Sequence, residues 1–162
     1  MYAYSNNGLS FRAWKDPGDL MEGEVFFDHQ PTDEEIANAF PGYAAASALL
    51  AVPGQSAALM AGGLTFTWSA NAALDGTYDV DPVQQQRIQA IGAGIAAGKG
   101  LPHGATTIAW PDHSGVPHLF TQDEFLDFGK ACEDFVYDIL TTESAKLQGI
   151  DAEWPAPSVP HP

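Results

Sequence analysis

Between residues 64 and 147, the same succession of patterns occurs twice. A stretch of alternating apolar and polar residues is followed by a turn, a second short strand-like stretch and a stretch with helical spacing. In the first copy, residues 64–69 alternate between Leu, Phe or Trp and Thr or Ser, which is typical of a strand with one buried face. Asp75-Gly76 is expected to turn the chain, because glycine tolerates the positive φ of tight hairpins, and residues 77–80 to form the return strand. Asp81-Pro82 predicts a helix start, since Asp accepts unpaired N–H groups and Pro lacks an N–H that would have no partner there.

The second copy predicts a hairpin of strands 106–110 and 116–120, joined by the Gly-containing turn 111–115. Thr121 and Glu124 have the spacing of a capping box, in which each side chain accepts from the other residue's backbone N–H. Apolar residues then mark one face of a long helix: Phe125, Phe128, Cys132, Phe135, Val136 and Ile139. Residues 64–149 are therefore predicted to form a ββαββα domain, either a duplicated ββα unit or two occurrences of a common motif.

Residues 1–43 predict a small N-terminal α+β unit. Strands 1–4 and 9–14 flank an Asn-Asn-Gly turn, and residues 24–27 are expected to form a third strand. Thr32 and Glu35 form a second capping box, which opens a short helix that Pro41-Gly42 ends. No signal-peptide pattern occurs at the start, so export by that route is not expected.

Residues 44–63 are rich in Ala and Gly and lie within an interval, Glu35 to Asp75, that has no charged residue inside it. Pro53-Gly54 is expected to interrupt this segment into runs too short to cross a hydrocarbon core of about 30 Å. Two alternatives remain: a buried helical connector, or a surface that another protein chain covers, because monomers seldom expose large apolar patches. The interface is favoured.

Residues 150–162 are rich in proline, which favours an extended chain with little reason to pack on its own core. If such a tail is ordered, a partner protein is expected to hold it, with Trp154 as an anchor. The other candidate anchors are Trp14 and Trp110, although aromatic residues at strand ends more often pack within a fold.

The chain has 162 residues, with 6 Lys and Arg against 21 Asp and Glu. A net charge of −15 repels phosphate backbones and anionic lipids, so a nucleic-acid-binding function is excluded and membrane insertion is not expected. The charge also keeps a protein soluble, or attracts a basic partner. The one cysteine, Cys132, is expected to be a small buried hydrophobic residue without a disulfide partner.

The candidates for a catalytic or metal site are His103, Asp112, His113 and His118, near the second hairpin. Two imidazoles and a carboxylate suit Zn²⁺, but the spacing matches no metal motif, and solvent-facing hairpin histidines are expected instead. Acidic residues 33–35 and 123–124 fall in first helical turns, where they complement the helix dipole. No nucleophile, zinc or phosphate-loop motif is present, so no catalytic, cofactor-binding or metal residue is assigned.

Two stretches carry a family resemblance: Ala73-Leu-Asp-Gly-Thr-Tyr78 with Asp81-Pro82 and residues 84–88, and residues 109–120 with the helix 125–136. Together they resemble a domain of tail-fibre-associated and tail-fibre-assembly-like proteins of phages and prophages. Pro31-Thr-Asp-Glu-Glu followed by Phe40-Pro-Gly-Tyr43 is similar to the leader of such proteins. The resemblance implies a setting and no catalytic residue.

The sequence therefore predicts an α+β protein without enzymatic activity or cofactor, made in the bacterial host and built into a phage tail. There it is expected to bind other tail or fibre proteins in an oligomeric assembly. An alternative is a fibre assembly chaperone that leaves the finished particle. A third hypothesis, a metal-dependent hydrolase centred on His113 and His118, requires bound metal.

Overall fold

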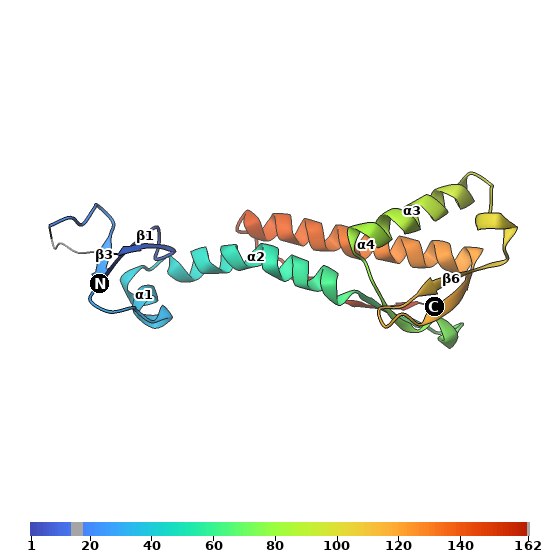
Figure 1. Ribbon diagram of the computed structural model, residues 1–162, viewed down its shortest axis with the longest axis horizontal. Coiled ribbons are helices and arrows are strands. Elements are labelled where there is room, and N and C mark those ends of the chain that lie inside the picture. Colours follow the sequence, from blue (N-terminus) through green and yellow to red (C-terminus); the bar gives the residue numbers. More distant parts are fainter. Residues whose placement is uncertain (14–17, 162) are drawn as a thin grey trace. The chain divides into compact units, whose positions relative to one another are not determined.

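The computed structural model describes residues 1–13 and 18–161 (Figure 1). Helices and small sheets alternate along the chain, which confirms the predicted α+β class and the long helix near the C-terminus. The chain divides into two units, Met1–Val52 and Pro53–Pro162, which we describe separately. Trp14, which ends the predicted second strand, and Pro162, which ends the predicted tail, lie outside the described residues.

The first unit contains a three-stranded antiparallel sheet with the order β2-β1-β3. Its strands are β1 (Tyr2–Ser5), β2 (Ser10–Ala13) and β3 (Val25–Phe27), at the positions of the predicted hairpin and third strand. Asn6, Asn7 and Gly8 turn the chain between β1 and β2 with positive φ angles of 52°, 53° and 81°. This left-handed conformation is the one that Asn and Gly tolerate best.

The short helix α1 (Asp33–Ala39) begins at the predicted capping box of Thr32 and Glu35. It packs its buried Ile36 against Tyr4 and Phe40 in a small core. A Cβ at Gly8 would overlap Ile36 Cγ2, so both φ and space require glycine at this turn. The turn and the helix start of this unit therefore depend on residues that are close together in the sequence.

The second unit contains a sheet with the order β5-β4-β8. Its strands are β4 (Leu64–Trp68), β5 (Gly76–Tyr78) and β8 (Ser158–His161). The predicted turn at Asp75-Gly76 is wrong in detail. A 3₁₀ helix, η1 (Ala72–Leu74), joins β4 to β5, and Gly76 lies in strand β5, outside the left-handed region. The Asp75 carboxylate instead accepts the Trp68 backbone N–H at 2.7 Å, which closes the connection without a glycine turn.

The second hairpin forms its own two-stranded sheet of β6 (Thr107–Pro111) and β7 (Pro117–Thr121). A helix follows each hairpin. Helix α3 (Pro82–Ala96) begins at the predicted Asp81 cap, and helix α4 (Gln122–Leu147) begins at the predicted capping box of Thr121 and Glu124. Another 3₁₀ segment, η2 (Pro102–Gly104), lies between α3 and β6. The two ββα successions therefore exist, but their hairpins belong to different sheets.

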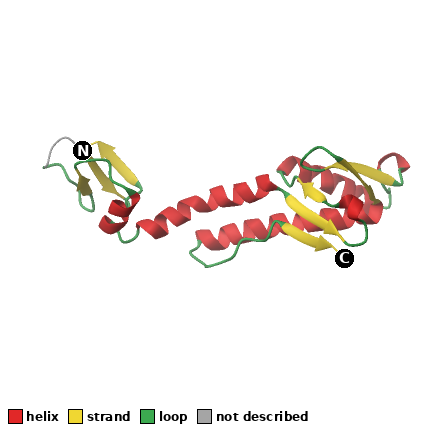
Figure 2. Ribbon diagram, turned by 90° about the horizontal axis from the view of Figure 1, so that it is seen from below, coloured by secondary structure: helices red, strands yellow, loops and turns green. Residues whose placement is uncertain are grey.

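An aromatic cluster fills the core of the second unit, with α3 and α4 side by side over the strands (Figures 1 and 2). Phe128 of α4 is its centre, with ring centroids 5.3 Å from Phe66, 4.9 Å from Tyr78 and 5.1 Å from Phe120. Burial raises the pKa of the Tyr78 phenol, whose hydroxyl donates to the Leu74 carbonyl at 2.7 Å. The predicted face of α4 is buried here as a whole.

The expectation that the proline-rich tail does not pack on its own core is wrong. Strand β8 pairs in parallel with β4, and the Thr65 and Ser69 N–H groups donate to the Pro157 and His161 carbonyls at 2.9 and 3.0 Å. A strand at a sheet edge tolerates proline because its outward N–H positions need no ladder partner. The free edge of β4 therefore takes the place of the expected partner protein.

The side chains of the tail strengthen this pairing. The His161 ring stacks on Trp68 with centroids 4.2 Å apart, and its Nε2 lies 3.8 Å from the Asp127 carboxylate of α4. Val159 packs against the main core. The tail is thus part of the second unit.

The apolar segment forms one helix, α2 (Tyr43–Gly62), and the boundary between the two units falls inside it. The predicted interruption at Pro53-Gly54 is wrong, because the helix continues through Pro53 (Figure 1). Proline removes one backbone hydrogen bond from a helix, and the Ala and Leu residues on both sides are among the strongest helix formers.

Candidate functional site

Each histidine candidate of the second hairpin contacts a carboxylate, His113 one beyond β5 and His118 one in its own hairpin. His113 Nδ1 lies 2.5 Å from Asp79 Oδ1, just beyond β5, and the His113 N–H donates to the Thr77 carbonyl at 2.7 Å. His118 Nδ1 lies 2.7 Å from the Ala73 carbonyl oxygen and its Nε2 3.4 Å from Asp112 Oδ2. These contacts tie the hairpin of β6 and β7 to β5, to the residue just beyond it and to η1.

The Asp112 carboxylate is already occupied by its own turn. Its Oδ1 accepts the Ser114 and Val116 N–H groups at 2.9 and 2.8 Å. The Val116 N–H bond and then the neighbouring His118 lower the pKa of this carboxyl. His103 lines a different hollow, together with residues 99–102.

Within residues 1–13 and 18–161, no group of three His, Cys, Asp or Glu side chains is placed to hold a metal ion. The hairpin histidines therefore form two separate pairs, His113 with Asp79 and His118 with Asp112. Each pair can cross-link strands and turns. Neither arrangement places a nucleophile beside its base, which acyl-transfer chemistry requires.

The other titratable candidates have structural contacts. Glu35 and Glu124 accept the N–H groups of Thr32 and Thr121 at 2.8 and 2.7 Å, as the capping boxes predict. Burial raises the pKa of the Cys132 thiol to about 12, so this residue is a weak nucleophile at neutral pH.

Two of the predicted tryptophan anchors contact their own chain. Trp110 is buried against Phe125 with ring centroids 5.3 Å apart. The Trp154 indole N–H donates to Gln55 Oε1 at 3.0 Å, and Lys146 Nζ lies 5.6 Å from its ring centroid. Trp154 thus connects the tail to α2 and α4 within the second unit.

The surface of α2 is apolar and largely uncovered. The helix has no charged residue, and only 11 % of its most apolar 18-residue window is buried. Val52 and Ser56 are buried, and Leu59 and Met60 pack on the core of the second unit, so one narrow stripe is covered. Apolar residues lie on every side, whereas a monomer's surface helix usually has a polar outer face. Most of the surface of α2 is therefore exposed in the unit to which each part of the helix belongs.

Among the described residues, α2 is also the one helix long and apolar enough to cross a membrane, with 20 residues and a hydropathy of 1.4. Core helices of soluble proteins share this length and composition. The predicted ground for excluding a span, two short runs, is wrong because the runs form one helix.

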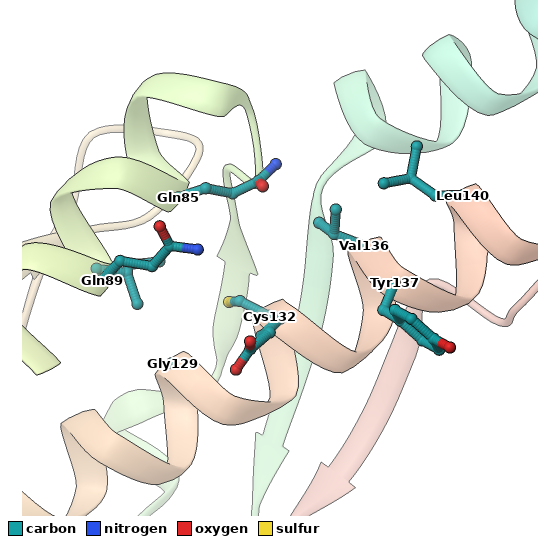
Figure 3. A pocket seen from close by; sticks show the side chains of 9 residues that line it. Gln85, Gln89, Gly129, Cys132, Val136, Tyr137 and Leu140 are labelled. Carbon is teal, nitrogen blue, oxygen red and sulfur yellow. The ribbon is translucent and has the colours of Figure 1, made fainter. Parts of the chain in front are cut away.

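A second apolar surface lies between α3 and α4, where two adjoining hollows measure about 200 and 310 Å³. Ile88, Gln89, Gly129 and Glu133 line both. Figure 3 shows Gln89 extending from α3 and Val136 and Leu140 from α4 on the two sides of the smaller hollow. Sequence reasoning missed this groove, and of the helical glycines beside it only Gly129 of α4 lies close to the other helix, with a built Cβ 2.9 Å from Ile88 Cγ2.

The protein is thus a mixed α+β protein whose most unusual feature is the exposed apolar helix α2. The chain belongs to the family described as domain of unknown function DUF4376, whose model matches residues 43–159. The match begins at the first residue of α2 and ends within β8, so it includes the uncovered helix, both ββα successions and the tail. No curated protein and no solved structure matches the chain.

Proposed function

We propose that this protein is a non-enzymatic structural adaptor of a bacteriophage tail, located at the tail tip or fibre, and that it binds other tail proteins through α2. The observation that carries the proposal is the exposure of α2, a 20-residue uncharged helix. Contiguous apolar surface of this kind marks binding sites, because exposure to water is unfavourable. The resemblance of residues 73–88 and 109–136 to tail-fibre-associated proteins supports the setting.

The packing of α2 favours a protein partner over a lipid bilayer. Leu59 and Met60 are held on the aromatic core, and Gln55 accepts a hydrogen bond from Trp154. If this second half stays on the core, residues 43–51 provide a rise of only about 14 Å at about 1.5 Å per residue. A bilayer core of about 30 Å is twice as thick.

Quantitative mass spectrometry of purified particles, from the replicon that encodes this chain, tests the proposal. A structural adaptor is expected in a small, fixed ratio to the major tail protein. Two variants locate the contact: Leu50→Glu in α2 and Leu119→Glu in β7, at side chains 67 % and 61 % exposed. Both add one negative charge, and only Leu50→Glu should reduce incorporation.

Absence of the unaltered chain from particles would contradict the adaptor proposal. If the absent chain instead co-purified with free fibre protein, it would be an assembly chaperone, which needs an exposed apolar surface for a different purpose. Equal incorporation of the two variants would show that α2 is not the contact.

A further inference from the structure

The partner of α2 is constrained by charge. The whole chain has a net charge of −15, yet the interval between Glu35 and Asp75, which contains all of α2, has no charged residue. A basic partner would be attracted to acidic surfaces such as the outer face of α4. An uncharged contact is instead what two strongly acidic chains need, because any other approach brings like charges together.

We infer that the partner of α2 is α2 of further copies of this chain, in a bundle of at least three copies. This inference rests on the proposed function of α2 as a protein-binding surface and names its partner. Exposed positions occur on both sides of the covered stripe, from Ala44 and Leu50 to Ala57 and Ala61, so each helix can contact more than one neighbour.

The available area indicates more than a pair. A 20-residue helix is about 30 Å long and about 11 Å across, which gives a side surface of about 1,000 Å², less the stripe that already packs on the chain's own core. One neighbouring helix covers about a third of that surface, whereas stable interfaces bury about 800 Å² on each partner. Two neighbours per helix, as in a bundle of three or more, approach the required area.

The composition of α2 permits close packing. Ala, Gly and Ser make up most of the helix, and small residues allow helix backbones to approach each other. Leu49 and Leu50 are the large exposed side chains, 40 % and 67 % exposed, and are placed to fill the space between such helices.

Light scattering of the full-length purified chain after size-exclusion chromatography tests the inference. The expected mass is at least three times that of one chain, 17.2 kDa. Leu50→Glu should convert the oligomer to a monomer, because it places like charges together in an apolar contact, while Leu119→Glu should leave the mass unchanged. Circular dichroism of both variants verifies that the chain is folded. A mass of one or two copies for the unaltered chain would overturn the inference.

A cysteine variant gives an independent measurement with no added charge. Leu50→Cys is expected to form disulfide-linked dimers under mild oxidation, and Leu119→Cys is not. The native Cys132 is 1 % exposed and does not compete. Equal cross-linking of the two variants would overturn the inference.

Membrane association is tested with neutral phosphatidylcholine vesicles. Flotation of the unaltered chain with vesicles, together with a monomeric mass without them, would assign α2 to a bilayer and overturn the bundle. Presence in phage particles together with a monomeric purified chain would overturn the bundle alone. Absence from particles together with an oligomeric mass would contradict the adaptor role alone.

Discussion

The two longest helices of this protein differ in how much of their apolar surface is buried. Helix α4 buries six residues along one face and has seven carboxylates and two lysines elsewhere. Its apolar face is therefore covered within one chain. Helix α2 has apolar residues on all sides and buries only a narrow stripe. Burial thus separates a helix whose apolar face is covered within the chain from a helix whose apolar surface is largely exposed.

The largest difference is expected in the free energy of unfolding, when one large apolar side chain of each helix is changed to alanine. Phe128→Ala in α4 should lower the free energy of unfolding by about 3–5 kcal/mol, because it opens a cavity among packed aromatic rings. Leu50→Ala in α2 should change it by at most about 0.5 kcal/mol in the monomer, because that side chain is 67 % exposed. Urea unfolding at low protein concentration measures both.

Comparable losses in the two variants would mean that α2 is already buried within one chain. If the Leu50→Ala loss in unfolding free energy grew with protein concentration, the missing contact would be intermolecular.

A smaller difference is expected between two helical glycines of the groove. A Cβ at Gly129 of α4 would lie 2.9 Å from Ile88 Cγ2, so Gly129→Ala should destabilise the fold by about 1 kcal/mol despite better helix propensity. A Cβ at Gly92 of α3 would meet nothing within 4 Å. Gly92→Ala should therefore stabilise the fold by about 0.5–1 kcal/mol. Opposite signs in thermal unfolding check the pair, and equal stabilisation would mean that α3 and α4 pack less closely.

The sequence predicts those parts of the fold that depend on local chemistry. Both capping boxes, the Asp81 cap and the apolar face of α4 are where the pattern places them. Each depends on residues within a few positions of one another, and periodicity detects that range. The uncharged character of residues 44–63 indicates the candidate interaction surface in the same way.

Contacts between distant residues could not be predicted from the sequence, and neither could the balance of local effects that keeps α2 helical. The parallel pairing of β8 with β4 joins Ser158 to Thr65, and no local signal in a proline-rich tail specifies it. The continuation of α2 through Pro53 depends on the sum of helix propensities against one lost hydrogen bond, and the proline alone indicated a break. The groove depends on the close approach of Gly129 to Ile88, which only packing reveals.

The smallest expected effect concerns pH, because α4 begins at a titratable cap and α2 has no carboxylate. Hydrogen bonds from Asn71 and then from Thr121 lower the pKa of Glu124 below its ordinary 4.5. The folded form thus favours the ionised carboxylate. Its stabilisation is complete above about pH 4.5 and is lost as the pH falls through the lowered pKa.

Glu124→Gln should remove this contribution, because Gln keeps the capping geometry without titrating. Its unfolding free energy should fall less steeply than that of the unaltered chain below about pH 4.5. Glu133→Gln, an exposed change on the same helix away from the cap, is the matched control and should leave the slope nearly unchanged. Hydrogen exchange then separates the helices, since acid should weaken protection in the first turn of α4 and leave the uncharged α2 unaffected. Equal acid sensitivity of the two helices would mean that the cap at Glu124 does not control the start of α4.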